Sequence, residues 1–118
     1  MSVEATIFNA LKHLVANRVY PDMAPESISR PYITFQQVGG RSVNFLSGDL
    51  PDKRNSRFQI NVWADSRLDA ARVAKQVDDT LRQVNALQTT VLSEPIATVE
   101  PETRLYGTRQ DVSFWFAN

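Results

Sequence analysis

The chain has 118 residues, the length of one ordinary domain; 42% are hydrophobic and 22% charged, so the composition is globular rather than disordered. Thirteen basic and thirteen acidic side chains cancel, which removes the usual electrostatic argument for a nonspecific nucleic-acid or membrane-surface binder. The absence of cysteine excludes disulfides, a thiolate nucleophile and cysteine-based metal sites.

The N-terminal segment predicts a helix rather than a signal peptide. Apolar residues at helical spacing, with Ser2 as the N-cap, predict a helix over about residues 3–17. No basic segment precedes an apolar run here, and no stretch of the chain approaches the ~20 apolar residues of a membrane span, so we expect a soluble protein. Residues 18–30 contain Pro21 and Pro25 and show no periodicity, which predicts a long connection.

The middle of the chain alternates between strand patterns and turn signals. Residues 31–38 alternate apolar and polar side chains and predict a strand. Gly39 and Gly40 are a strong turn signal, so residues 42–46 are expected to return as the second arm of a hairpin. Residues 47–56 are polar and turn-rich, and they predict an exposed arm between two strands.

Two predicted strands carry a tryptophan on their polar side. Residues 57–64 (RFQINVWA) place Trp63 with the polar side chains, and the C-terminal segment RQDVSFWFAN places Trp115 in the same way. One possibility is that each ring lies flat over its own sheet. Because helices on one face of a sheet leave the other face open, we favour protein–protein contact, in which Trp is enriched at hot spots.

The region after residue 64 contains the clearest helix of the sequence. An apolar stripe capped by Ser66 predicts a helix over about residues 66–84, and the neighbours Asp78 and Asp79 are expected on its solvated face. A short strand is predicted at 89–95, followed by an edge strand or loop before the C-terminal strand. The whole pattern predicts an α+β fold: one domain, 1–118, with an antiparallel sheet of about four to five strands and two helices packed on one face.

Candidates for catalysis are few. The only histidine, His13, is expected on the solvated side of the first helix. Four carboxylates lie close together in sequence near the C-terminal strands: Glu94, Glu100, Glu102 and Asp111. Two of them meeting in a cleft would suit a divalent metal or acid–base chemistry, so a small carboxylate-dependent metal hydrolase or nuclease is the alternative hypothesis. We predict no catalytic residue, cofactor site or metal site.

The predicted arm and its surroundings combine apolar and basic side chains. Phe45, Leu46 and Leu50 are apolar groups in or beside a segment that a monomer would keep polar, which favours a contact with a partner.

A small basic cluster follows in sequence. Lys53, Arg54 and Arg57 suit nucleic acid in principle, and a generic nucleic-acid-binding module is a third hypothesis. Three charges without interleaved aromatic residues are typical of a soluble loop, so we assign Arg54 and Arg57 to the candidate partner interface instead.

The order of the predicted elements and several short sequence segments resemble those of a known family. A proline precedes the first strand in SRPYITFQQV, the step VNFLSG follows, and RFQINVWAD leads into the capped helix SRLDAARVAKQVDDTLRQV. The chain closes with acidic residues and a strand, VEPETRLYGTRQDVSFWF. Together these segments resemble the small tail-completion proteins of long-tailed bacteriophages and prophages, which are similar to tail-terminator proteins.

The resemblance implies a structural role in the virion tail, with assembly in the host bacterial cytoplasm. It implies a ring, often a hexamer, that caps the tail tube and joins it to the head connector or head-completion protein. It implies no catalysis, cofactor or metal, and DNA would pass through only as cargo. The candidate interface residues rest on the strand-face argument and not on a family motif: Trp63, Trp115, Phe45, Leu46, Leu50, Arg54 and Arg57.

Overall fold

The computed structural model describes residues 2–118 as two α-helices and a six-stranded sheet. The elements in chain order are α1 (Val3–Leu11), β1 (Val19–Pro21), β2 (Tyr32–Gly39), β3 (Lys53–Ala64), α2 (Arg67–Arg82), β4 (Thr90–Val91), β5 (Ile96–Glu100) and β6 (Leu105–Ala117). Single 3-10 turns, Lys12–Leu14 and Asn85–Leu87, come shortly after the two helices. The predicted α+β fold class is confirmed.

Both helices begin at the predicted serines. The Ser2 hydroxyl accepts a hydrogen bond from the amide of Ala5, and the Ser66 hydroxyl accepts one from the amide of Asp69, each at 3.1 Å. These bonds satisfy amides that the first turn of a helix leaves without a partner. The first helix is shorter than the predicted 3–17: the α-helix ends at Leu11 and continues only as the 3-10 turn Lys12–Leu14. The left-handed conformations of Ala16 and Asn17, with φ of 50° and 68°, prevent any helix from reaching residue 17.

The sheet is mixed rather than purely antiparallel. Its strands are ordered β1-β2-β3-β6-β4, and β5 pairs with the same edge of β6 as β4. Only β1 and β2 run parallel; all other pairs are antiparallel. The expected antiparallel sheet of four to five strands was therefore wrong in this detail. The strand β1 has three residues, too few to show an alternating pattern, and it lies within the expected connection 18–30.

The predicted hairpin with residues 42–46 is wrong. The partner of β2 is β3, with Gly39 opposite Arg57, and residues 42–46 form no strand. Residues 53–56, expected in an exposed arm, belong to β3. The connection between β2 and β3 is thus residues 40–52, called the 40–52 loop below.

The core lies between the helices and one face of the sheet. Phe58 is its centre: the ring centroid lies 6.1 Å from that of Phe35 and 5.6 Å from that of Phe114, and the Phe58 ring is tilted against both. Around them pack buried residues from both helices and from the central strands, including Ile7, Leu11, Ile33, Ile60, Val62, Val73, Val77, Leu81 and Val112. The predicted inward faces of 57–64 and of the C-terminal strand are those observed.

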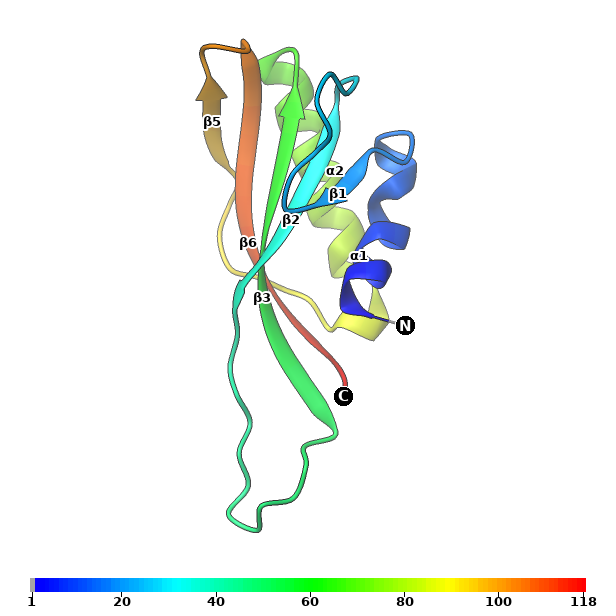
Figure 1. Ribbon diagram of the computed structural model, residues 1–118, viewed down its shortest axis with the longest axis vertical. Coiled ribbons are helices and arrows are strands. Elements are labelled where there is room, and N and C mark those ends of the chain that lie inside the picture. The colour runs from blue at the N-terminus through cyan, green and yellow to red at the C-terminus, as the bar shows by residue number, and fades with distance from the viewer. Residues whose placement is uncertain (1) are drawn as a thin grey trace.

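The molecule is elongated because the 40–52 loop projects beyond the helices (Figure 1). Its longest extent is 53 Å, against 25 and 23 Å in the other directions. The radius of gyration is 15.2 Å, whereas a compact domain of this length has about 13.5 Å. The 40–52 loop lies at one end of the long axis, and β5 and the start of α2 lie toward the other. Among residues 2–118, no helix is both long and apolar enough to cross a membrane.

Candidate functional site

The 40–52 loop carries the most exposed apolar side chains. Leu46 is fully exposed, Leu50 is 88% exposed and Phe45 is about half exposed. The tip is a local turn: the Gly48 amide donates to the Phe45 carbonyl, and the Ser47 hydroxyl donates to the Asp49 carboxylate at 2.9 Å. These bonds shape the tip without covering the apolar groups. The three residues predicted as partner contacts therefore lie together on one projecting segment.

Trp63 stands on the sheet face opposite the helices, and its ring covers a glycine on the neighbouring strand. Gly107 is its register partner, and a Cβ added there would lie only 2.8 Å from Cε3 and 2.9 Å from Cζ3 of Trp63. The ring therefore packs directly against Gly107, and it is half-buried. Part of this tryptophan's role is intramolecular, and the signal in the sequence was the glycine in the strand pattern of β6.

Tyr32 flanks Trp63 on its other side, opposite it in the β2–β3 register. Burial raises the pKa of the Tyr32 hydroxyl, the negative charge of Glu100 raises it further, and Arg30 acts against both. Arg30 itself forms an exposed ion pair with Asp65 at 2.7 Å. The end of the outer face near β5 is therefore a mixed aromatic and charged surface.

Trp115 lies on the same outer face, toward the 40–52 loop. It is half-buried and opposite Asn55 in the β3–β6 register. The Asn55 amide group donates to the Ser113 hydroxyl at 2.8 Å and to the Phe114 carbonyl at 2.9 Å, which ties the two strands together at this point. The structure places both tryptophans on the face that neither helix covers, as the strand pattern predicted.

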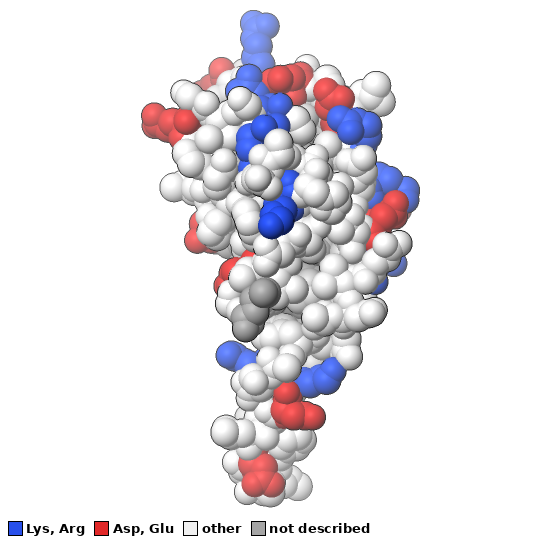
Figure 2. Space-filling model, turned by 90° about the vertical axis from the view of Figure 1, so that its right-hand side faces the viewer, with Lys and Arg blue, Asp and Glu red and all other residues white. Residues whose placement is uncertain are grey.

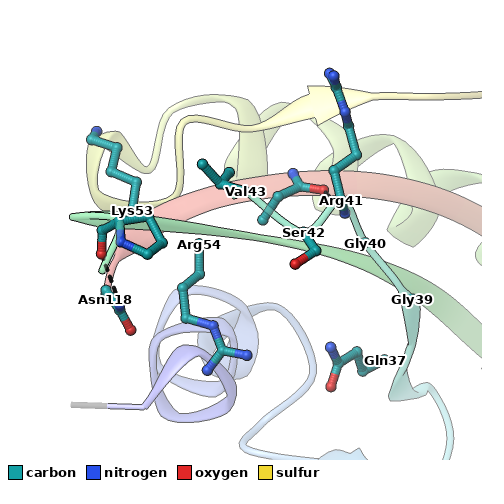
Figure 3. A pocket seen from close by; sticks show the side chains of 11 residues that line it. Gln37, Gly39, Gly40, Arg41, Ser42, Val43, Lys53, Arg54 and Asn118 are labelled. Atoms are coloured by element: carbon teal, nitrogen blue, oxygen red, sulfur yellow. Dashed lines mark hydrogen bonds between the residues drawn. The ribbon is translucent and has the colours of Figure 1, made fainter. Parts of the chain in front are cut away.

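The basic residues near the loop do not form one site. Arg57 is paired across the sheet with Asp111, at 2.6 and 3.0 Å from the same carboxylate oxygen. A hollow of about 460 Å³ at the root of the 40–52 loop is lined by Arg41, Lys53 and Arg54. Figure 3 shows that these three side chains point away from one another, so the hollow does not gather their charges on one bound anion.

The four candidate carboxylates are dispersed. Asp111 is held by Arg57 on the outer face, Glu94 lies beside α2, and Glu100 and Glu102 lie at the end of β5 and in the turn after it. No group of three or more histidine and acidic side chains suited to a metal ion occurs within residues 2–118. The alternative hydrolase hypothesis has no assembled site in this part of the chain.

A groove of about 360 Å³ lies between α2 and the segment leading into β5. Its floor and walls are small and largely apolar: Ala71, Ala74, Pro95, Ala97 and Thr108. Charged side chains border it: Arg67, Lys75, Asp78 and Glu94. Arg67 is fixed there, because its guanidinium donates to the carbonyls of Gly107 and Thr98. No local pattern indicated this groove, because its two sides are far apart in the chain.

Asp78 is buried, in contrast to the expected solvated face. Only 8% of the residue is exposed, and its carboxylate accepts hydrogen bonds from Arg82 and from the Gln110 amide, the latter at 3.1 Å. Burial acts to raise the pKa of Asp78, but the bonds from Arg82 and Gln110 outweigh it and hold the pKa below its usual value. Helical spacing alone did not reveal that Gln110 of β6 faces this position.

Replacing Asp78 with Asn is expected to lower the free energy of unfolding at pH 7 by about 1–3 kcal/mol. A carboxylate with a depressed pKa stabilises the fold above its unfolded-state pKa, and this contribution is lost as the pH falls through the folded-state pKa. The difference between wild type and Asp78→Asn should therefore shrink below about pH 4. Urea unfolding at pH 7 and pH 3 measures it. The control is Asp79→Asn, the same substitution at the exposed residue next to Asp78. An equal effect of the two substitutions on the free energy of unfolding would contradict the prediction.

Comparison with known proteins decides the family. The family model described as tail completion protein gp17 matches residues 8–117. The chain belongs to this tail-completion family. Among solved structures, 20 chains match, and one of them, which bears only a sequence label as its name, aligns over 99% of this chain and 97% of its own with a TM-score of 0.55 at 12% identity. That likeness concerns the fold alone, and no curated protein matches the chain.

Membership in the tail-completion family makes this protein a component of a phage tail. It confirms the resemblance drawn from the order of elements. In such a protein the exposed apolar loop and the open sheet face are surfaces available to other head and tail proteins. The groove beside α2 and the covering of Gly107 by Trp63 are the features of this tail-completion protein that the sequence pattern did not reveal.

Proposed function

We propose that this tail-completion protein forms a ring that caps the tail tube and offers the surface to which the head connector joins. The observation that carries the proposal is the 40–52 loop, which projects from the body with Leu46 and Leu50 almost wholly exposed. Exposed leucines on an extended segment have no stabilising role in a monomer, and they suit a surface that is buried on assembly. Copies of one chain that meet head to tail close into a ring when the rotation fits.

The proposed interface includes the residues singled out from the sequence: Trp63, Trp115, Phe45, Leu46, Leu50, Arg54 and Arg57. Of these, Trp115 and the three loop residues are the better candidates, because Trp63 already covers Gly107 and Arg57 already binds Asp111. The mechanism is complementarity of surfaces and not catalysis. Partners are further copies of the chain, the tail tube protein and the head connector, with DNA passing through the ring and assembly taking place in the host cytoplasm.

Light scattering behind size exclusion, over a wide range of concentration and with or without purified tail tubes, tests the proposal. The expected result is a species whose mass is a whole multiple of the 13.3 kDa chain, either free or bound to the ends of tubes. The Trp115→Ala variant should assemble less well at equal concentration while its circular dichroism stays that of the wild type. A chain that remains a monomer at every concentration and ignores tubes would overturn the proposal.

A further inference from the structure

The 40–52 loop and the groove beside α2 are two apolar surfaces of the described chain with complementary shapes: the loop protrudes and the groove is concave. The loop offers protruding side chains at its tip, Phe45, Leu46 and Leu50, with no internal partner for the leucines. The groove offers a concave surface of small residues, Ala71, Ala74, Pro95 and Ala97 among them. Protruding leucines and a groove lined by alanines bury apolar area together without polar groups losing their partners.

The two features cannot meet within one molecule. Figure 1 shows the loop at one end of the long axis, whereas β5 and the start of α2 lie toward the opposite end. That axis extends over 53 Å. A contact between them is therefore a contact between two copies, and it joins different surfaces of the two. Such a contact is heterologous, which is the kind that generates a ring.

The tip of the loop is acidic, and the groove is bordered by charges of both signs, so a cation at its rim can face the tip. The tip of the loop carries Asp49 without a lysine or arginine between residues 42 and 52, while its root carries Lys53 and Arg54. Figure 2 shows acidic side chains at the tip of the projecting segment and basic ones farther up the body. The groove is bordered by two cations, Arg67 and Lys75, and by two carboxylates, Asp78 and Glu94. Asp78 is already bound by Arg82 and Gln110, and Lys75 pairs with Asp79. Opposite charges at the rim guide and orient such a contact.

We propose that the 40–52 loop of one copy binds in the α2–β5 groove of the next copy, with Leu46 and Leu50 against Ala71 and Ala97. The inference rests on the proposed ring and specifies the contact that closes it. In this arrangement the apolar tip is buried, Asp49 lies near Arg67 and Lys75, and the root of the loop remains outside the groove. Each copy gives one loop and receives one, so no loop is left exposed in a closed ring.

The absence of cysteine makes a cross-linking test direct. A Leu46→Cys chain and an Ala71→Cys chain are mixed, allowed to assemble with tail tubes present, and oxidised. The expected product on a non-reducing gel is a dimer that contains one copy of each, and a chain with both changes should give a ladder of higher products. The matched control replaces Ala71→Cys with Met23→Cys, which is 81% exposed but does not line the groove. That control should stay at the background of random collisions.

A second measurement uses no cross-link. Changing Leu46 and Leu50 together to serine is expected to weaken assembly by at least about tenfold, because these side chains supply the buried centre of the contact. Met23→Ser removes a largely exposed apolar side chain that does not line the groove, and it should leave assembly unchanged. Neither change touches the core, so circular dichroism and unfolding should match the wild type in both.

The outcomes separate this inference from the proposed function. A ring that forms with no more Leu46–Ala71 cross-link than the Met23 control overturns the loop-in-groove contact while leaving the ring intact. If a benzophenone attached at Leu46→Cys couples to the tube protein and not to a second copy, the loop binds the tube, and the inference is again overturned. Failure to assemble at all, with tubes present, overturns both. Selective cross-linking together with the serine effect supports both.

Discussion

Phe58→Ala is expected to lower the free energy of unfolding by about 3–5 kcal/mol. Phe58 is 1% exposed and its ring contacts those of Phe35 and Phe114, so removing it leaves a cavity between two aromatic rings and the helices. Total stabilities of domains are about 5–15 kcal/mol, so this loss is a large fraction of the stability of the fold.

Urea unfolding followed by tryptophan fluorescence and circular dichroism measures this effect. Phe45→Ala is the matched control, because it removes the same side chain from the 40–52 loop, where the ring is about half exposed. Its expected effect on unfolding is within about 0.5 kcal/mol. If Phe58→Ala and Phe45→Ala lower the free energy of unfolding equally, Phe58 is not at the centre of the core.

The second large effect is expected at Gly40, where the chain leaves β2 and crosses β3. A Cβ at this position would lie 2.4 Å from the Asn55 carbonyl oxygen and 3.0 Å from the Ser56 Cα, both of them backbone atoms that cannot rotate away. The backbone of Gly40 also has φ of 152°, a conformation that side chains disfavour. Gly40→Ala should therefore displace the 40–52 loop from β3, break the bond from the Arg41 amide to the Asn55 side chain, and impair assembly.

Gly39→Ala is a close control for Gly40→Ala. Gly39 has a similarly disfavoured φ of 132°, but nothing lies within 4 Å of its added Cβ. Both variants carry the cost of the strained backbone, about 1–3 kcal/mol, and the clash adds about another 1–3 kcal/mol at Gly40 alone. Thermal and urea unfolding of the two variants measure this difference. An equal loss in both would show that the close approach of Gly40 to β3 does not constrain the chain.

The consequence for assembly follows from the same geometry. The proposed contact needs the 40–52 loop to project in a defined direction, and Gly40 together with the Arg41–Asn55 bond sets that direction at the root. Gly39→Ala and Gly40→Ala should therefore differ in assembly more than in secondary structure. Such a difference would indicate that the direction of the loop matters as well as its apolar side chains.

Local patterns in the sequence determined much of this fold. The apolar stripe and the Ser66 cap were sufficient for α2, because helical periodicity and the capping hydrogen bond involve residues within a few positions of one another. Alternation was likewise sufficient for the inward face of β3 and for placing Trp63 and Trp115 on the outer face. The order of these elements was enough to indicate the tail-completion family, which the family match confirmed.

Only the tertiary structure decided how distant segments meet. The hairpin expected at residues 42–46 failed because β3, which is longer and has a buried face, takes the pairing edge of β2. Asp78 is buried because Gln110 comes opposite it from β6, and the Trp63 ring packs against the neighbouring strand because Gly107 is its partner in the β3–β6 register. Pairing register and packing depend on interactions between residues far apart in the chain, 18 positions for Gly39 and Arg57 and 44 for Trp63 and Gly107, which local periodicity does not encode. For the same physical reason, the exposed loop and the groove proposed to receive it became visible only in the folded chain.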